Sequence, residues 1–166
     1  MSMEAVNVLS LGVKNDGTED ISTIINEATK EHSLFFPKGF YKVSKPIYLK
    51  NSVKGDGYSR YSMSTCDHTW LISEIENEDS SIGILNIESG CPINIENISL
   101  KCHSHECGLR FPANTQKNMI FVDKVGIFDV RGYGLYEEGR GSRPLHFGVL
   151  RNLDKTSLCN EVLEEI

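Results

Sequence analysis

The sequence predicts an all-β solenoid, a chain wound into stacked coils of short strands, and two observations indicate this fold. First, residues 35–57 contain very short stretches in which apolar and polar residues alternate, as in strands with one buried face. Sharp turns separate these stretches at residues 37–39, 44–46 and 55–57. Second, an apolar pattern recurs later in the chain. Strands this short, with turns this close together, favour a coil over a hairpin sheet.

The repeat is clearest in the second half of the chain. Residues 95–100 align with residues 122–127, which lie 27 positions further on. Residues 150–153 align again 28 positions later, and Leu71 lies 27 positions before Ile98. Repeats of about 20–50 residues indicate stacked units whose apolar faces are completed by their neighbours. The repeat therefore predicts about four or five coils.

The segment before residue 35 is expected to close one end of the stack. Residues 6–11 have the pattern of a first short strand, and residues 14–20 have the turn residues of a polar loop. Helical spacing then predicts one short helix with a narrow apolar stripe, made of Ile21, Ile24, Ile25 and Ala28. Asp20 is expected to cap this helix, because its carboxylate can accept a hydrogen bond from an unpaired amide of the first turn. A helix here would cover backbone groups and apolar surface that otherwise invite aggregation.

Two motifs in the first third of the chain resemble those of a known family. Residues 12–20 read G-V-K-N-D-G-T-E-D, and residues 36–49 read F-P-K-G-F-Y-K-V-S-K-P-I-Y-L. They are similar to the opening of the pectate-lyase-like superfamily of right-handed parallel β-helices. Its members typically begin with G-A-x-G-D-G-x-T-D-D, a short helix and F-P-x-G-x-Y-x-V-S-x-P-I-x-L. Asn15 replaces the first glycine of G-D-G, the residue before Thr18 is missing, and residues 52–55 are shorter than usual. These departures concern the loops.

The resemblance implies a right-handed parallel β-helix in one domain over residues 1–166. Residues 1–34 would form an N-terminal strand and a helix that plugs the stack, residues 35–153 the coils, and residues 154–166 a C-terminal cap or tail. It also implies a polysaccharide partner, because the superfamily includes polysaccharide lyases, glycoside hydrolases and phage tailspikes. Tailspike-like members are commonly trimers, so a homotrimer is a further expectation.

Composition narrows the function classes. The net charge of -6 argues against a general nucleic-acid surface. The apolar runs are too short to span a membrane, and the first residues lack the basic and apolar regions of a signal peptide. We therefore expect a cytoplasmic protein by default, or a virion-associated one. The five cysteines are odd in number and scattered, which favours reduced and mostly buried thiols over a disulfide framework.

Candidate catalytic residues follow the last repeats. Glycoside hydrolysis uses two carboxylates, and the candidates for catalysis are Asp123, Asp129, Arg131 and Glu137, with Glu138 beside them. Asp129 and Arg131 are expected to point the same way from one strand. The resemblance implies that a lyase would pair calcium-binding acids with an Arg or Lys base, so Ca²⁺ would be its cofactor. No catalytic motif of the superfamily matches these positions, and an ordinary surface ion pair between Asp129 and Arg131 is the favoured alternative.

Aromatic side chains nearby could stack against sugar rings. We expect Tyr133, Tyr136 and Trp70 to be such substrate-binding platforms.

The most metal-like cluster consists of Cys102, His103, His105 and Cys107, because zinc prefers thiolate and imidazole ligands. No second ligand pair follows at zinc-finger spacing, so no metal is assigned. The favoured alternative is a polar corner in which the cysteines pack and the histidines face solvent.

Three functional hypotheses remain open from the sequence. The chain is a β-helix protein that cleaves a polysaccharide, a non-catalytic glycan-binding or structural module such as a tailspike-like shaft, or a truncated relative that lacks the catalytic coils. Fold alone does not separate them, because function depends on the site.

Overall fold

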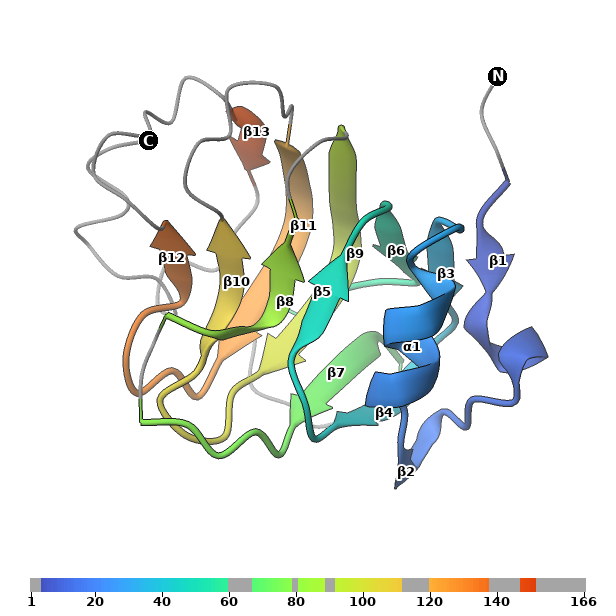
Figure 1. Ribbon diagram of the computed structural model, residues 1–166, viewed down its shortest axis with the longest axis horizontal. Helices are drawn as coiled ribbons and strands as arrows, with labels where there is room; N and C mark the ends of the chain where they lie inside the picture. Colours follow the sequence, from blue (N-terminus) through green and yellow to red (C-terminus); the bar gives the residue numbers. More distant parts are fainter. Residues whose placement is uncertain are drawn as a thin grey trace.

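The chain folds into a parallel β-helix of about four turns. The computed structural model describes residues 4–59, 67–78, 81–88, 92–111, 120–137 and 147–151. Each strand pairing within these residues is parallel, and Figure 1 shows the coils stacked from right to left. The predicted fold class is confirmed. No helix in these residues is long and apolar enough to span a bilayer.

The strands form three faces around one apolar interior. The first face contains β1 (Val6–Asn7), β3 (Leu34–Phe36), β6 (Val53–Gly55), the first halves of β9 (Ile93–Lys101) and β11 (Ile120–Phe128), and β13 (Phe147–Arg151). The second face contains β2 (Asp16–Asp20), β4 (Gly39–Val43), β7 (Thr69–Ser73) and the second halves of β9 and β11. The third face contains β5 (Ile47–Leu49), β8 (Gly83–Ile87), β10 (Cys107–Phe111) and β12 (Leu135–Glu137).

The bend between the first and second faces explains why β9 and β11 belong to both. Asn97 and Lys124 have φ values of 57° and 56°, in the left-handed region, so the strand direction changes at each of them. These two residues are 27 positions apart, at equivalent places in successive coils. Asn tolerates this conformation better than most residues, whereas a Lys there carries a steric cost.

The predicted repeat is confirmed in register, with one exception. Ile95 pairs with Val122 and Val122 with Leu150, as the alignment predicts. Leu71 pairs with Leu100 and not with Ile98, so that part of the prediction is wrong by two residues. Strand side chains alternate with a period of two, so a shift of two keeps Leu71 inside and the apolar pattern cannot detect it. Leu153 and the predicted tail over residues 154–166 lie outside the described residues.

The interior is filled by one inward-facing row of apolar side chains from each face. In the coil formed by β3, β4 and β5, the buried residues are Leu34, Phe36, Tyr41, Val43, Ile47 and Leu49. The Tyr41 ring meets Phe36 edge to face, with ring centroids 5.2 Å apart, and its hydroxyl donates to the Pro37 carbonyl over 2.7 Å. That hydrogen bond lets a tyrosine occupy the core without leaving its polar atom unpaired.

Helix α1 (Ser22–Ala28) covers the free edge of β5, as the predicted N-terminal plug requires (Figure 1). The Asn26 side chain accepts a hydrogen bond from the Tyr48 amide over 2.8 Å and donates to the Pro46 carbonyl over 3.1 Å. Thr29 Oγ1 accepts the Lys50 amide over 3.3 Å. The helix therefore satisfies backbone groups that an open end would expose.

Three details of the N-terminal prediction need correction. The expected first strand is only β1, because a short 3₁₀ helix, η1 (Val8–Leu11), follows it and ends at Gly12 with φ 88°. Residues 16–20 form β2 instead of a loop, pairing irregularly with β4. Ile24 is 40% exposed, because the helix buries Ile21 and Ile25 but turns Ile24 outward.

Asp20 joins the start of α1 to the end of β4. Its carboxylate accepts hydrogen bonds from the amide and hydroxyl of Ser22, over 3.1 and 2.6 Å, and from those of Ser44, over 3.0 and 2.6 Å. The expected bond to a first-turn amide is thus present, although Ile21 occupies the cap position. Partial burial alone would raise the pKa of Asp20, but the bonds from Ser22 and Ser44 outweigh it and lower the pKa from 3.8 to about 2.

We predict that Asp20 makes the fold sensitive to strong acid. A lowered pKa stabilises the fold above the unfolded value near 3.8, and this contribution is lost as the pH falls through about 2. The residue is partly exposed, so the contribution is about 1 kcal/mol after solvent screening. Urea unfolding of Asp20→Asn should show that loss already at neutral pH and a flatter pH dependence between these values. Glu31→Gln, at an exposed position, is the control, and equal pH dependence in Asp20→Asn and wild type would contradict the prediction.

Candidate functional site

The outer surface of the second face is covered where β7, β9 and β11 lie side by side. The Ser59 amide donates to Ser99 Oγ over 2.7 Å, and a Cβ built on Gly126 would lie 2.6 Å from the Ser59 carbonyl oxygen. Ser59 therefore lies directly against β9 and β11, and the missing side chain of Gly126 makes room for it. This surface is closed to a ligand at these positions.

Trp70 is fully buried, so its predicted role as a sugar-stacking platform is wrong. Its side chain is 0% exposed and packs against Phe128, with ring centroids 5.3 Å apart. Trp70 Nε1 has no hydrogen-bond partner in the residues that the structure describes. Both rings point outward from the second face, and the alternation of the strand gave no sign that another segment covers them.

An open groove runs along the corner where the chain leaves the second face. Three adjoining hollows of about 430, 420 and 670 Å³ form it, and His103 borders each of them. Its walls come from three successive coils, as residues 72–78, 101–104 and 129–131. We call this feature the corner groove.

A buried carboxylate holds the middle wall in place. Glu106 is 0% exposed, and its oxygens accept hydrogen bonds from the amides of His103, over 3.1 Å, and Ser104, over 2.6 Å. The hydroxyl of Ser73, at the end of β7, donates to the same carboxylate. Glu106 thus joins the loop after β9 to the neighbouring coil, in a buried network whose hydrogen bonds are strengthened by the charge.

The first wall is fixed to the middle wall through backbone groups. The Asn77 carbonyl accepts hydrogen bonds from Ser104 Oγ and from the His105 amide, both over 3.0 Å. The Ile75 amide donates to Ser73 Oγ over 3.0 Å, and the Ile75 side chain is buried. Glu74, Glu76 and Glu78 are exposed, so the first wall of the groove is acidic.

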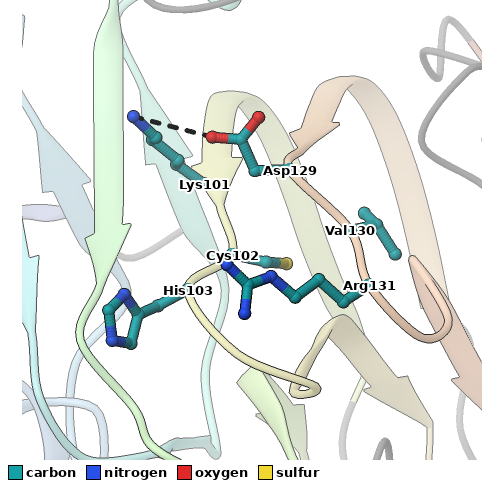
Figure 2. A pocket seen from close by; sticks show the side chains of 6 residues that line it. All are labelled: Lys101, Cys102, His103, Asp129, Val130 and Arg131. Atoms are coloured by element: carbon teal, nitrogen blue, oxygen red, sulfur yellow. Dashed lines mark ion pairs between the residues drawn. The ribbon is translucent and has the colours of Figure 1, made fainter.

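Asp129 and Arg131 both border the groove, but they do not form a strand-borne pair. β11 ends at Phe128, and Asp129 has a φ of 57°, so both residues lie in the turn beyond the strand. The Asp129 carboxylate is 3.6 Å from Lys101 Nζ. Figure 2 shows that the Arg131 guanidinium reaches the other way, toward Cys102 and His103. The ion pair that we considered between Asp129 and Arg131 is replaced by one between Asp129 and Lys101.

The other catalytic candidates lie elsewhere or cannot be placed. Asp123 is on the first face, in register with Glu96 and Arg151. Five residues of β11, residues 124–128, separate Asp123 from Asp129, and the strand bends at Lys124 between them. Asp123 does not border the corner groove, and its catalytic role stays a prediction. The backbone of Glu137 is in β12, but its side chain and the whole of Glu138 lie outside the described part of the chain.

Tyr133 and Tyr136 lie together. Their ring centroids are 6.2 Å apart, and Tyr133 is 37% exposed. Neither borders the corner groove. Their role in sugar binding stays a prediction.

The cluster of cysteine and histidine residues has the arrangement of a packed corner. Cys102 and Cys107 are free and buried, whereas His103 and His105 are exposed. Burial raises the pKa of the Cys102 thiol, and the nearby Glu106 raises it further, so the thiol stays protonated. In the described ranges, no three His, Cys, Asp or Glu side chains come together as metal ligands. Cys66, Cys91 and Cys159 lie outside those ranges.

Comparison with known proteins supports the resemblance of the N-terminal part. Residues 5–78 match the family described as rhamnogalacturonase A/epimerase, pectate lyase-like. The chain folds as a parallel β-helix, and its N-terminal part is pectate-lyase-like. Its fold is also similar to that of ORF18 of Geobacillus virus E2, with a TM-score of 0.63 and 22% identity over 80% of this chain. The match spans 27% of the length of that protein. No curated protein matches the chain.

Sequence reasoning singled out Cys102, His103, Asp129 and Arg131, but it missed Glu106 and the acidic wall of the groove. Glu106 stands alone between two histidines and a cysteine, a setting that gives no sign of burial. The acidic wall is visible in the sequence as an acidic stretch from residue 74 to residue 79. Within this stretch, Glu74 and Glu76 alternate with Ile75. Because alternate residues of an extended segment face the same way, this pattern was the available sign that the glutamates share one exposed side.

Proposed function

We propose that this chain binds a polysaccharide along the corner groove, as the glycan-binding module of a β-helix protein. The observation that carries the proposal is that one groove crosses three successive coils. Neighbouring strands are about 4.8 Å apart, so the groove extends about 10 Å along the helix axis. A groove of this shape suits a segment of an extended polymer better than a compact small molecule.

The lining of the groove supports the same proposal. Carboxylates, a guanidinium, an imidazole and backbone groups are the donors and acceptors that sugar hydroxyls pair with. The Glu106 network and the backbone bonds of Asn77 hold these groups in place before a ligand arrives. Preorganisation of this kind lowers the entropic cost of binding.

Lyase-type cleavage is the second candidate, because Asp129 and Arg131 border the same hollow of about 430 Å³. An arginine in that position could act on a proton of an acidic sugar while neighbouring groups hold the chain. Calcium needs six to eight oxygen ligands, and the described residues do not bring three acidic ligands together for it. We therefore derive no step through calcium.

The test is a polysaccharide panel of pectins, alginates, capsular and host glycans, incubated with the purified chain. Binding is measured by affinity electrophoresis, and polymer length before and after incubation is measured with calcium and with chelator. We expect one polymer to bind, with an affinity up to about tenfold weaker in His103→Ala, since one net hydrogen bond contributes about 0.5–1.5 kcal/mol. His32→Ala, a histidine distant from the groove, is the control.

The outcomes separate the candidates. Shortening of the bound polymer would make the chain an enzyme, and loss of shortening in Arg131→Ala with retained binding would assign the lyase role. Equal binding by His103→Ala and wild type would exclude the groove as the site. Sedimentation of the same sample would show a trimer if the chain forms a tailspike-like shaft, a role that the fold shared with the viral protein supports. A monomer would count against the shaft.

A further inference from the structure

The largest hollow of the groove contains charged side chains that the protein itself does not neutralise. Glu76, Glu78 and Arg131 border this hollow of about 670 Å³. No ion pair or side-chain hydrogen bond joins any of the three to another residue in the described ranges. Elsewhere in the groove the charges are paired, since Lys101 lies against Asp129 and Lys42 is 3.7 Å from Glu74.

The backbone fixes where these three charges stand. Ile75 is buried and the Asn77 carbonyl is bonded to the loop after β9, so Glu76 and Glu78 are held on the open side of their segment. Arg131 extends over the middle of the groove from the opposite wall (Figure 2). The hollow thus presents two carboxylates on one wall and one guanidinium on the other.

Resting on the proposed function, we propose that this end of the groove selects a zwitterionic glycan, one with protonated amino groups alternating with acidic groups. Two carboxylates attract an ammonium group, and a guanidinium pairs with a carboxylate or sulfate through parallel hydrogen bonds. A uniformly acidic polymer would meet two like charges, and a uniformly basic one would meet Arg131. A neutral glycan would form hydrogen bonds with these groups but would gain no ion pair from any of them.

The expected preference follows from the strength of exposed ion pairs. Each such pair changes affinity by up to about fivefold. Acting together, the three charges would favour the zwitterionic ligand by about tenfold to a hundredfold over a neutral one of the same length. Because the side chains are exposed, the preference should fall as salt is added.

The test compares four oligosaccharides of equal length, using calorimetry on the full chain in mildly acidic buffer at low salt. They are N-deacetylated heparosan, in which glucosamine alternates with glucuronate, and oligomers of glucosamine, N-acetylglucosamine and galacturonate. The zwitterionic oligomer should bind tightest. The double variant Glu76→Gln, Glu78→Gln should no longer bind the zwitterionic oligomer more tightly than oligogalacturonate. Arg131→Gln should no longer bind the zwitterionic oligomer more tightly than the glucosamine oligomer. Glu88→Gln and Lys50→Gln, both away from the groove, should keep both preferences.

The two proposals fail in different ways. Tight binding of the neutral or the galacturonate oligomer, weakened by His103→Ala, would overturn the zwitterion proposal and support the proposed function. Unchanged preferences in the groove variants would also overturn it. Failure of all four oligomers and of the whole polysaccharide panel to bind would overturn both.

Discussion

Replacement of Gly55 by alanine is expected to destabilise the protein by about 3 kcal/mol or more. Gly55 ends β6, which pairs with β9, and a Cβ at this position would lie 2.1 Å from the Asn97 carbonyl oxygen and 2.9 Å from Thr69 Cβ. The nearest atom belongs to the backbone of the bend residue, so no side-chain rotation can relieve the contact. The two coils would have to separate where the interior is closely packed.

Urea unfolding followed by circular dichroism measures this loss. Lys54→Ala is the matched control, because the adjacent side chain is exposed and its removal should change the free energy of unfolding by less than about 0.5 kcal/mol. A loss below about 1 kcal/mol in Gly55→Ala would mean that β6 and β9 can move apart cheaply. That result would contradict the prediction that close packing keeps β6 and β9 from separating.

Glu106→Ala should be nearly as damaging, with a loss of about 3 kcal/mol. The substitution leaves the amides of His103 and Ser104 and the hydroxyl of Ser73 without their buried acceptor. Glu106→Gln keeps the shape and one oxygen, but its NH₂ group would face donors, so we expect an intermediate loss. The damage should reach the groove, because those two amides form its middle wall.

Two measurements check this role of Glu106. Urea unfolding gives the stability, and hydrogen exchange should show faster exchange at the His103 and Ser104 amides in Glu106→Ala. Glu76→Ala, in which the deleted carboxylate is exposed, should leave both quantities close to those of the wild type. Slow exchange at the two amides in Glu106→Ala would show that another group holds the loop.

Local patterns in the sequence were sufficient to predict the coils. Strands with one buried face have a period of two, and the turns between them require glycine or proline, so residues 35–57 and the 27-residue repeat could be interpreted directly. Register was predictable only where successive coils have the same length. The coil from Leu71 to Leu100 is two residues longer than the coil from Leu100 to Ile127, because the connection between β7 and β8, residues 74–82, is longer than the connection between β9 and β10, residues 102–106. Leu71 was therefore aligned two residues away from its partner.

The candidate site was only partly predictable, because coil stacking brings its walls together. Asp129 and Arg131 were found as neighbours in sequence. Their position opposite Glu76 depends on how two other coils align, which no local pattern encodes. Glu106 was missed for the same reason, since its burial results from contact with Ser73 in the coil before it.

The covered surface of the second face gives the protein a second apolar layer, outside the helix. The sequence contains one tryptophan, Trp70, and that residue lies in this outer layer beside Phe128. The intrinsic fluorescence of Trp70 therefore reports on the covered outer surface of the second face and not on the interior of the β-helix. During urea unfolding, the Trp70 emission could shift to longer wavelength before the circular dichroism signal changes. That order would show that the outer surface of the second face is exposed to water while the coils remain folded.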